Sequence, residues 1–339
     1  MSFIGEVKTL TEPPTIEARN LVKHFPVKMG FFKTLVSRET TVVHAVDDVS
    51  FKIPQGEVFG LVGESGCGKT TTGRVLLRLT EPTAGEVFFK GINITSISRE
   101  SEMRKLRAKM QIIFQDPYES LNSRMGIFDI VAEPLRLQKI TKRGKETRER
   151  VVEALEDMEM FPAEEFMYRF PHELSGGQRQ RIAIARAFVL RPEFLVADEP
   201  VSMLDVSIRS EVLKLLLTLI QKNQASFLYI THDIAVARHM CDRLAVMYLG
   251  KIVEKANTED LIHKPLHPYS EALIAAVPVP DPSARRIDVK IIGEVPSAIN
   301  PPSGCRFHTR CPYAMEICKK KDPELKEIGK NRYVACHLR

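Results

Sequence analysis

The stretch GESGCGKT, residues 63–70, constrains this chain more than any other feature. It follows the apolar run EVFGLV, and KTTTGRVLLRL after it carries apolar residues at helical spacing, so strand, loop and helix come in the order that G-x-x-x-x-G-K-[ST] requires. The glycines let consecutive backbone N–H groups point into one concavity, where the helix N-terminus adds its positive end. The stretch predicts a phosphate-binding loop; a simple glycine turn is the alternative.

The residue types of this loop predict how a nucleotide is bound. Lys69 is placed to reach the β- and γ-phosphates, and the Thr70 hydroxyl is placed to bind Mg²⁺. We expect the nucleotide contacts of the loop at Gly63, Ser65, Gly66, Cys67, Gly68, Lys69, Thr70 and Thr71.

Two acids follow the apolar run FLVA at 194–197. Asp198 is expected to hold Mg²⁺, and Glu199 is expected to orient or deprotonate the water that attacks the γ-phosphate. Adjacent acids at the end of a buried strand are costly unless a cation or water compensates them, although a structural helix cap is the other interpretation. The pair therefore predicts the catalytic half of an ATP-hydrolysing site.

The alternation of strands and helices predicts an α/β fold with a largely parallel sheet. SFLYITHD at 226–233 is a second buried strand, which a helix at 210–223 precedes, and 126–190 reads as helical. A strand over 15–26 continues into a basic hairpin, whose segment KMGFFK at 28–33 is interpreted as a solvated tip or a membrane contact. No internal repeat is visible.

Composition places limits on the location of the protein. The 339 residues are enough for two domains, and the net charge of +6 suits phosphate ligands or an anionic membrane surface. No apolar run approaches the roughly 18 residues that cross a bilayer, and the start lacks an export signal. The chain is expected in the cytoplasm.

Four of the six cysteines lie within the last 35 residues, after proline-rich connectors near residue 278. We predict domains at 1–277 and 278–339. In a reducing compartment the cysteines indicate a metal site rather than disulfides, and their spacing C-x5-C-x6-C-x17-C lacks the close pairs of zinc fingers. An iron–sulfur cluster, zinc and unliganded packing all stay open. The residues concerned are Cys305, Cys311, Cys318 and Cys336.

The segment LSGGQRQRIAIARAF at 174–188 supplies a second phosphate-binding helix start. With GESGCGKT, ADEP, SMLDVS and ITHD in this order, LSGGQ resembles the nucleotide-binding subunits of ATP-binding-cassette (ABC) systems over residues 15–275. The resemblance implies a P-loop cassette with a mostly parallel core sheet, an antiparallel β subdomain and a helical subdomain at about 116–190. It also implies a head-to-tail dimer with ATP shared between the two chains.

The same resemblance assigns individual residues. Phe25 would stack on adenine, Gln115 would sense the γ-phosphate and Mg²⁺, and His232 would contact the γ-phosphate. Taken alone, Phe25 could be a core aromatic and Gln115 a strand-end polar residue. The residues that act on the partner's ATP would be Ser175, Gly176, Gly177, Gln178 and Asp205.

A closer resemblance covers nearly the whole chain. The segments AVDDVSF, MQIIFQDPYESLNSRM and HPYSEAL, with NPPSGCRFHTRCPYAMEIC and VACH near the end, are similar to the F-type ATPase subunits of oligopeptide/dipeptide importers. This implies a homologous D-type partner, two transmembrane permease subunits, an extracytoplasmic binding protein and attachment to the cytoplasmic face of the membrane. It also favours a [4Fe–4S] cluster over zinc. Met203, where the family has alanine, is the one departure noted.

Alternatives remain for the transported solute and for transport itself. Similar ATPases serve sugar or nickel importers. A soluble ABC protein that acts on DNA or ribosomes is the rival of another class, but the chain has neither a long coiled-coil insertion nor tandem cassettes. Its basic run at 136–150 also lacks interleaved aromatics, so no nucleic-acid partner is expected.

Overall fold

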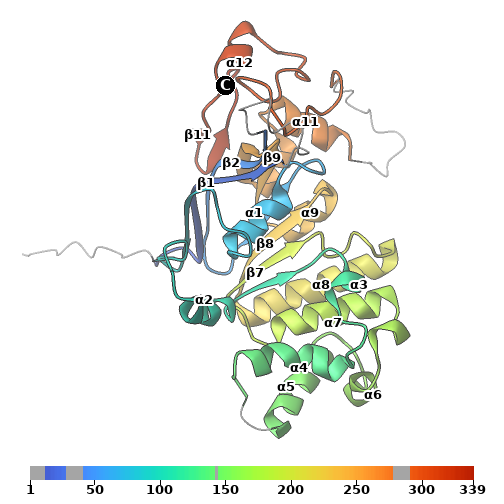
Figure 1. The fold of residues 1–339 in the computed structure, drawn as a ribbon. Coiled ribbons are helices and arrows are strands. Elements are labelled where there is room, and N and C mark those ends of the chain that lie inside the picture. The colour runs from blue at the N-terminus through green and yellow to red at the C-terminus, as the bar shows by residue number, and fades with distance from the viewer. Residues whose placement is uncertain (1–11, 28–40, 142–143, 278–290) are drawn as a thin grey trace, which may run out of the picture.

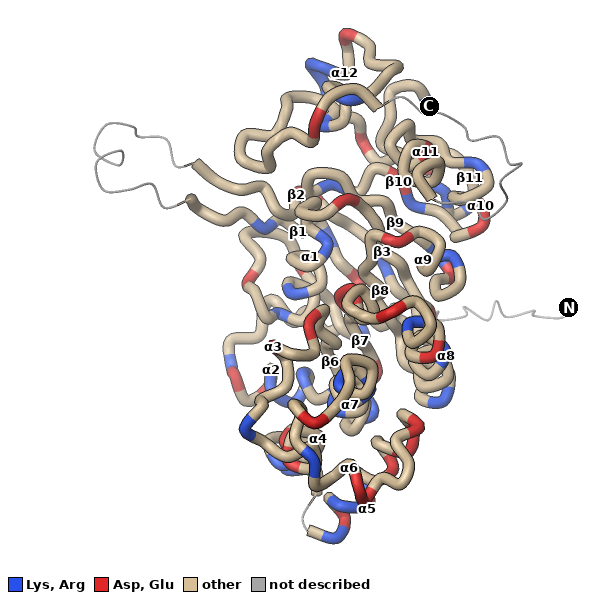
Figure 2. Tube along the Cα trace, turned by 90° about the vertical axis from the view of Figure 1, so that its right-hand side faces the viewer, with Lys and Arg blue, Asp and Glu red and all other residues tan. Residues whose placement is uncertain are grey.

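The computed structural model describes residues 12–27, 41–141, 144–277 and 291–339. The segment 28–33, with its predicted hairpin tip or membrane contact, lies outside them. In Figure 1 a central sheet region lies between a helical lobe and the C-terminal extension. Figure 2 shows basic and acidic residues interspersed over all three parts, a distribution that fits the modest net charge of +6. In the described part of the chain the basic residues do not form a continuous stripe in this view.

The larger sheet has eight strands in the order β11-β12-β10-β9-β3-β8-β7-β6. Strands β9, β3, β8, β7 and β6 are parallel, and β10, β12 and β11 add antiparallel pairs at one edge. Every residue of β3 and β7 is buried, as a parallel sheet covered on both faces requires. The α/β prediction is confirmed. The strands are β3 (Val58–Val62), β6 (Met110–Ile113), β7 (Phe194–Asp198), β8 (Ser226–Thr231), β9 (Arg243–Tyr248), β10 (Lys251–Asn257), β11 (Lys326–Gly329) and β12 (Arg332–Val334).

A second, antiparallel sheet has the order β2-β1-β4-β5. Its inner face and the helix α1 (Lys69–Leu76) bury one hydrophobic core together with residues of β3. This packing lays α1 against the β1–β2 pair, in which Phe25 lies opposite Val43. The strands are β1 (Ile16–Pro26), β2 (Val42–Ile53), β4 (Ala84–Phe89) and β5 (Ile92–Asn93), and the helix α2 (Glu100–Arg107) follows them.

The segment 116–190, where the resemblance implied a helical subdomain, forms the lower lobe of Figure 1. It contains α3 (Pro117–Ser120), α4 (Ile127–Leu137), α5 (Gly144–Glu156), α6 (Ala163–Met167), the short 3₁₀ helix η1 (Pro171–Glu173) and α7 (Gly176–Phe188). The helices α8 (Val206–Asn223), α9 (Ile234–Met240), α10 (Thr258–His263) and α11 (Pro268–Ala275) complete the cassette. Among the described residues, no helix is both long and apolar enough to span a membrane.

The C-terminal extension continues the larger sheet. Strand β12 pairs antiparallel with β10, with Tyr333 opposite Lys255 and Val334 opposite Glu254, and β11 pairs with β12. The helix α12 (Glu316–Lys320) precedes these strands. Because residues 278–290 are not described, the domain boundary after residue 277 stays a prediction, but backbone hydrogen bonds join the two predicted domains.

Candidate nucleotide-binding site

The predicted phosphate loop connects β3 to α1, and its shape depends on glycine. Gly63, Gly66 and Gly68 have φ values of 156°, 76° and 110°. A Cβ at Gly63 would overlap the carbonyl oxygen of Met247, and one at Gly68 would overlap that of Ala45. Side chains are therefore excluded from the back of the loop, so its backbone can approach a phosphate closely.

Lys69 is the first residue of α1 and is buried, with 5% of its surface exposed. Its Nζ donates hydrogen bonds to the carbonyl oxygens of Gly63 at 2.7 Å and Glu64 at 2.9 Å. These two carbonyls compensate the burial of the ammonium group and fix it at the centre of the loop. The cation is thus held where phosphate oxygens would enter.

Thr70 and Asp198 meet although 128 positions separate them. The Thr70 hydroxyl donates a hydrogen bond to Asp198 Oδ1 at 2.9 Å. Burial raises the pKa of Asp198, which ends β7. A hydroxyl and a buried carboxylate are oxygen ligands of the kind that Mg²⁺ prefers, so this pair fits the predicted ion.

Glu199 lies where three parallel strands end at one edge of the sheet. Its Oε2 accepts a hydrogen bond from Gln115 Nε2 at 3.1 Å and lies 3.1 Å from His232 Nδ1. Gln115 follows β6, Glu199 follows β7 and His232 follows β8, so parallel strand order brings all three together. Glu199 also has a left-handed backbone, with φ of 47°, a conformation that concentrates at functional sites.

These groups surround a hollow of about 590 Å³, a volume usual for a small-molecule site. Phe25, the phosphate loop, and the group of Gln115, Glu199 and His232 all line it, and we call the loop its floor and Phe25 with the residues beside it its wall. Its lining includes most of the predicted nucleotide residues, namely Phe25, Ser65, Gly66, Gly68, Lys69, Thr70, Thr71 and Gln115.

Three predicted residues do not line this hollow, and two residues that line it were not predicted from the sequence. Gly63, Cys67 and Asp198 are not part of the lining. Val43 and Ala45, which were not predicted, extend the wall beside Phe25. Val43 lies opposite Phe25 in the β1–β2 register, so the alternation along that strand was the signal that could have identified it.

The predicted second phosphate grip lies elsewhere in the chain. Ser175 caps α7: its Oγ accepts from the Gln178 N–H at 3.3 Å, and Gln178 Oε1 accepts from the Ser175 N–H at 3.0 Å. A Cβ on Gly177 would lie 2.6 Å from Ile208 Cγ2, so packing against α8 also requires this glycine. Asp205 is the N-cap residue of α8. None of these residues lines the hollow beside Lys69.

The four clustered cysteines are all free thiols. Burial, together with the negative charges that Cys318, Cys336 and Cys311 would carry, raises the pKa of Cys305 to about 12, so the four side chains are electrostatic neighbours. Four thiols form a soft donor set that suits iron–sulfur clusters or zinc. A bound cation would reverse the thiol pKa shift and hold the thiolate form.

A compact set of possible metal ligands lies away from the four cysteines. In the described part of the chain, one set of three possible ligand atoms lies within 4.8 Å of one another, contributed by His24, His44 and Asp47. Asp47 also forms an ion pair with Arg306, which occupies its carboxylate. No three cysteine Sγ atoms in this part of the chain are as close together as those atoms.

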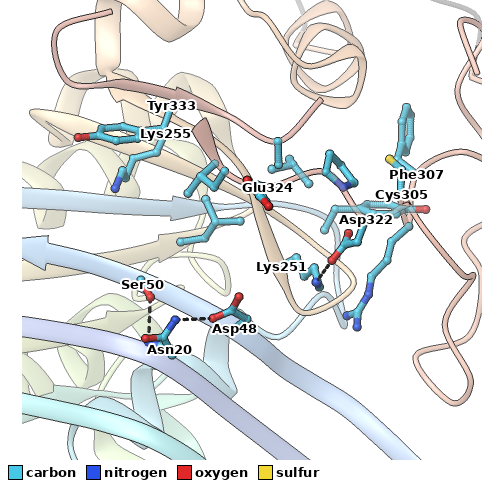
Figure 3. A pocket seen from close by; sticks show the side chains of 17 residues that line it. Asn20, Asp48, Ser50, Lys251, Lys255, Cys305, Phe307, Asp322, Glu324 and Tyr333 are labelled. Carbon is cyan, nitrogen blue, oxygen red and sulfur yellow. Dashed lines mark hydrogen bonds and ion pairs between the residues drawn. The ribbon is translucent and has the colours of Figure 1, made fainter. Parts of the chain in front are cut away.

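A second hollow, of about 400 Å³, lies between β1, β2, β10 and the extension (Figure 3). Several of its polar groups pair with one another: Asn20 Nδ2 donates to Asp48 at 2.8 Å, and Lys251 pairs with Asp322. Lys255 lies over the ring of Tyr333 at 4.1 Å. This second hollow contains none of the predicted nucleotide residues.

A glycine-rich loop before a helix, with acids at the ends of neighbouring parallel strands, defines a P-loop nucleotide-binding protein. Comparison with known families extends this class: residues 46–202 match the ABC transporter family, and residues 253–318 match the oligopeptide/dipeptide transporter C-terminal region. The chain belongs to the ABC transporter family, and it is an ABC-type ATPase.

Relatives match along nearly the whole chain. A probable peptide ABC transporter ATP-binding protein of Sinorhizobium fredii is 47% identical over 324 residues, which cover 96% of this chain and 90% of that protein. An oligopeptide transport ATP-binding protein of Bacillus subtilis is 46% identical over 325 residues, covering 95% and 97%. A dimeric ATP-binding cassette, solved in a post-hydrolysis state with ADP and phosphate, is 30% identical with a TM-score of 0.62 and covers 72% of this chain and 98% of its own. The predicted cassette fold is confirmed.

Proposed function

We propose that this chain hydrolyses ATP to power the import of oligopeptides or dipeptides through a membrane transporter. The observation that carries the proposal is the convergence of Gln115, Glu199 and His232 on one side of a hollow whose floor is the loop of Lys69 and Thr70. The names of the relatives support peptides as the solute, as does the match of residues 253–318 to the oligopeptide/dipeptide transporter C-terminal region.

Each side chain at the hollow has a defined task in this proposal. Phe25, 39% exposed, offers its ring for stacking on adenine beside Val43. Lys69 neutralises the β- and γ-phosphates, and the loop N–H groups bind their oxygens. Thr70, Asp198 and Gln115 would hold Mg²⁺, which neutralises phosphate charge when it is bound.

Glu199 is the proposed base. Its carboxylate takes the proton of the attacking water, while Gln115 and His232 hold that carboxylate by the contacts at 3.1 Å. His232, whose side chain is 60% exposed, can also turn toward the γ-phosphate. The proposed catalytic residues are thus Glu199 as the base, His232 beside it and Lys69 on the phosphates.

The proposed working unit is a dimer of ATPase subunits. Ser175, Gly176, Gly177 and Gln178 do not line their own chain's hollow, and in this proposal they face ATP held by a partner, with Asp205 at the start of the neighbouring helix α8. A related cassette of known structure is dimeric with ADP and phosphate. We propose a homologous D-type subunit as the partner, at the cytoplasmic face of the membrane. Two permease subunits would dock near the loop after Gln115, where Tyr118 is 59% exposed, and a binding protein would deliver the solute.

The four cysteines are proposed to hold a [4Fe–4S] cluster. A single zinc ion with Zn–S bonds of about 2.3 Å needs sulfur atoms about 3.8 Å apart. No three cysteine Sγ atoms of the described residues lie within 4.8 Å of one another, so the thiols are not arranged as one zinc ion needs them. Four thiolates are also the usual ligand set of a [4Fe–4S] cluster, in which each thiolate binds a different iron. The cysteines would fasten the loop-rich part of the extension.

Glu199→Gln tests the proposed hydrolysis. The amide cannot accept the water's proton, so we expect ATP turnover to fall by about 10²–10⁴-fold, while MgATP binding persists and the dimer stays closed. Lys69→Ala is the matched variant, because it should lose affinity for the nucleotide itself. Phosphate release and equilibrium binding of a fluorescent ATP analogue separate the two effects, and wild-type turnover by Glu199→Gln would exclude Glu199 as the base.

Peptide import needs a test in cells. A strain whose only copy carries Glu199→Gln should lose uptake of a labelled oligopeptide while it keeps uptake of a free amino acid. Unchanged oligopeptide uptake, with no ATP turnover by the purified variant, would show that the ATPase serves another solute.

A further inference from the structure

The C-terminal extension holds the phosphate loop from behind. Glu64, the second residue of that loop, receives two hydrogen bonds from Arg310: Nη1 to Oε2 at 2.8 Å and Nη2 to Oε1 at 3.1 Å. Arg310 belongs to the extension, 246 positions further along the chain. Such a two-pronged arginine–carboxylate pair fixes both the position and the orientation of the carboxylate.

Glu64 is linked in turn to the groups that would bind phosphate. Its N–H donates to the Tyr269 hydroxyl at 2.9 Å, and its carbonyl oxygen accepts from Lys69 Nζ at 2.9 Å. The side chain, amide and carbonyl of one residue are thus held by Arg310, Tyr269 and Lys69. A shift of Glu64 would move one of the two carbonyls that position the lysine.

The other end of this contact is rigid. Arg310 is buried, with 7% of its surface exposed, and its guanidinium lies 5.9 Å from the ring centre of Phe307. Phe307 packs edge-on against Tyr248, with ring centres 5.3 Å apart, and at a tilt against Tyr269, with ring centres 5.4 Å apart. Because these aromatic side chains come from both the cassette and the extension, the arginine is supported on a packed surface.

A second segment of the extension reaches the same region. Val295, Pro296 and Ala298 face residues 64–67 of the phosphate loop across a small hollow of about 210 Å³. The carbonyl of Ala298 accepts from the His44 N–H at 3.0 Å, and Ile299 bridges to Val43, which lines the proposed adenine wall. The extension therefore touches both the floor and the wall of the proposed ATP site from their outer side.

We propose that Arg310 is a positioning residue for ATP: through Glu64 it fixes the phosphate loop, so that the C-terminal extension sets the affinity of the ATP site. The inference rests on the proposed function of that site. Arg310 and Arg306, which binds Asp47, both lie in the loop between Cys305 and Cys311. Metal binding, or any other event that orders the loop between Cys305 and Cys311, would then change nucleotide affinity through Arg310.

The experiment is a double-mutant cycle on the full chain. Arg310→Ala, Arg310→Lys, Glu64→Ala and the Arg310→Ala/Glu64→Ala pair are compared for the Kd of a fluorescent ATP analogue with Mg²⁺, and for kcat and KM of hydrolysis. Asp322→Asn is the matched control, because it removes another ion pair of the extension, with Lys251, that does not contact the loop. Thermal unfolding checks that every variant is folded.

We expect Arg310→Ala to raise both Kd and KM about tenfold, with kcat within about twofold of wild type. Glu64→Ala should have the same effect, and the double variant should be no weaker than either single one, since all three lack the same pair. Arg310→Lys should recover part of the affinity, and Asp322→Asn should keep it. If Arg310→Ala fails to fold, Arg310→Lys and Glu64→Ala carry the test.

Two results would overturn the inference. One is an ATP affinity equal to that of the wild type in folded Arg310→Ala. If Arg310→Ala does not fold, the equivalent result is wild-type affinity in both Arg310→Lys and Glu64→Ala. The other is a double variant whose loss equals the product of the two single losses, because Arg310 would then act independently of Glu64. A wild-type protein that binds no ATP would instead refute the proposed function, which keeps the two failures distinct.

Discussion

Adding one methyl group to Gly177 or to its neighbour Gly176 should have opposite effects on stability. Both glycines begin α7, and in both variants alanine is the better helix former, by up to about 1 kcal/mol. At Gly176 the nearest atom to the new Cβ is 3.8 Å away, which is ordinary contact. At Gly177 the Cβ would lie 2.6 Å from Ile208 Cγ2, so α7 and α8 must move apart.

The difference between the two variants isolates the steric term. Because the helix-propensity gain is similar at both positions, it largely cancels, and the overpacking cost of about 1–3 kcal/mol remains. Gly177→Ala should therefore be less stable than Gly176→Ala by this amount. Ile208 Cγ2 is bonded to Cβ, close to the backbone, and cannot swing aside as the end of a long side chain could.

Urea unfolding followed by circular dichroism measures this difference. Gly177→Ala should unfold at lower urea than wild type, and Gly176→Ala at the same or higher urea. Ile208→Ala, added to Gly177→Ala, should recover stability because it removes the clashing methyl group. Equal midpoints for the two glycine variants would refute the packing argument and leave phosphate binding as the sole reason for both glycines.

Two further predictions concern pH and metal content. Burial lowers the pKa of His267 to about 3 from 6.5, so the unfolded chain binds an extra proton between these values. The free energy of unfolding should fall as pH drops through this window, by up to about 1.4 kcal/mol per unit, and His267→Asn should flatten that slope in urea titrations at pH 4 to 7. Protein purified without oxygen should contain about four irons and four sulfides per chain and absorb visible light, and Cys336→Ser should lose both. One zinc or no metal in the wild type would contradict the cluster.

Local sequence patterns predicted the proposed ATP site in large part. The glycine spacing before Lys69 and the acids at 198–199 carry their chemistry in a few consecutive residues, and parallel strand order then places their ends at one edge. Phe25 and Gln115 have no such local signal, and only the family resemblance assigned them. The structure brings both to the same hollow.

Other features depend on residues that are far apart and individually ordinary. Nothing in the sequence around Arg310 or Glu64 predicts that they pair, because an arginine and a glutamate are usually solvated surface residues. The same is true of Val43 and Ala45 in the site wall, and of Ile208, whose contact gives Gly177 a packing role.

The sequence by itself determined the fold class, the phosphate loop and the strand-end acids, since periodicity and glycine spacing act over a few residues. It also predicted a separate C-terminal domain from a change in composition. Only the tertiary structure decided that strand β12 joins the core sheet and that Arg310 reaches the phosphate loop. The physical reason is that strand pairing and buried ion pairs depend on which distant segments come into contact when the chain folds. Local sequence patterns extend over only a few residues and do not show those contacts.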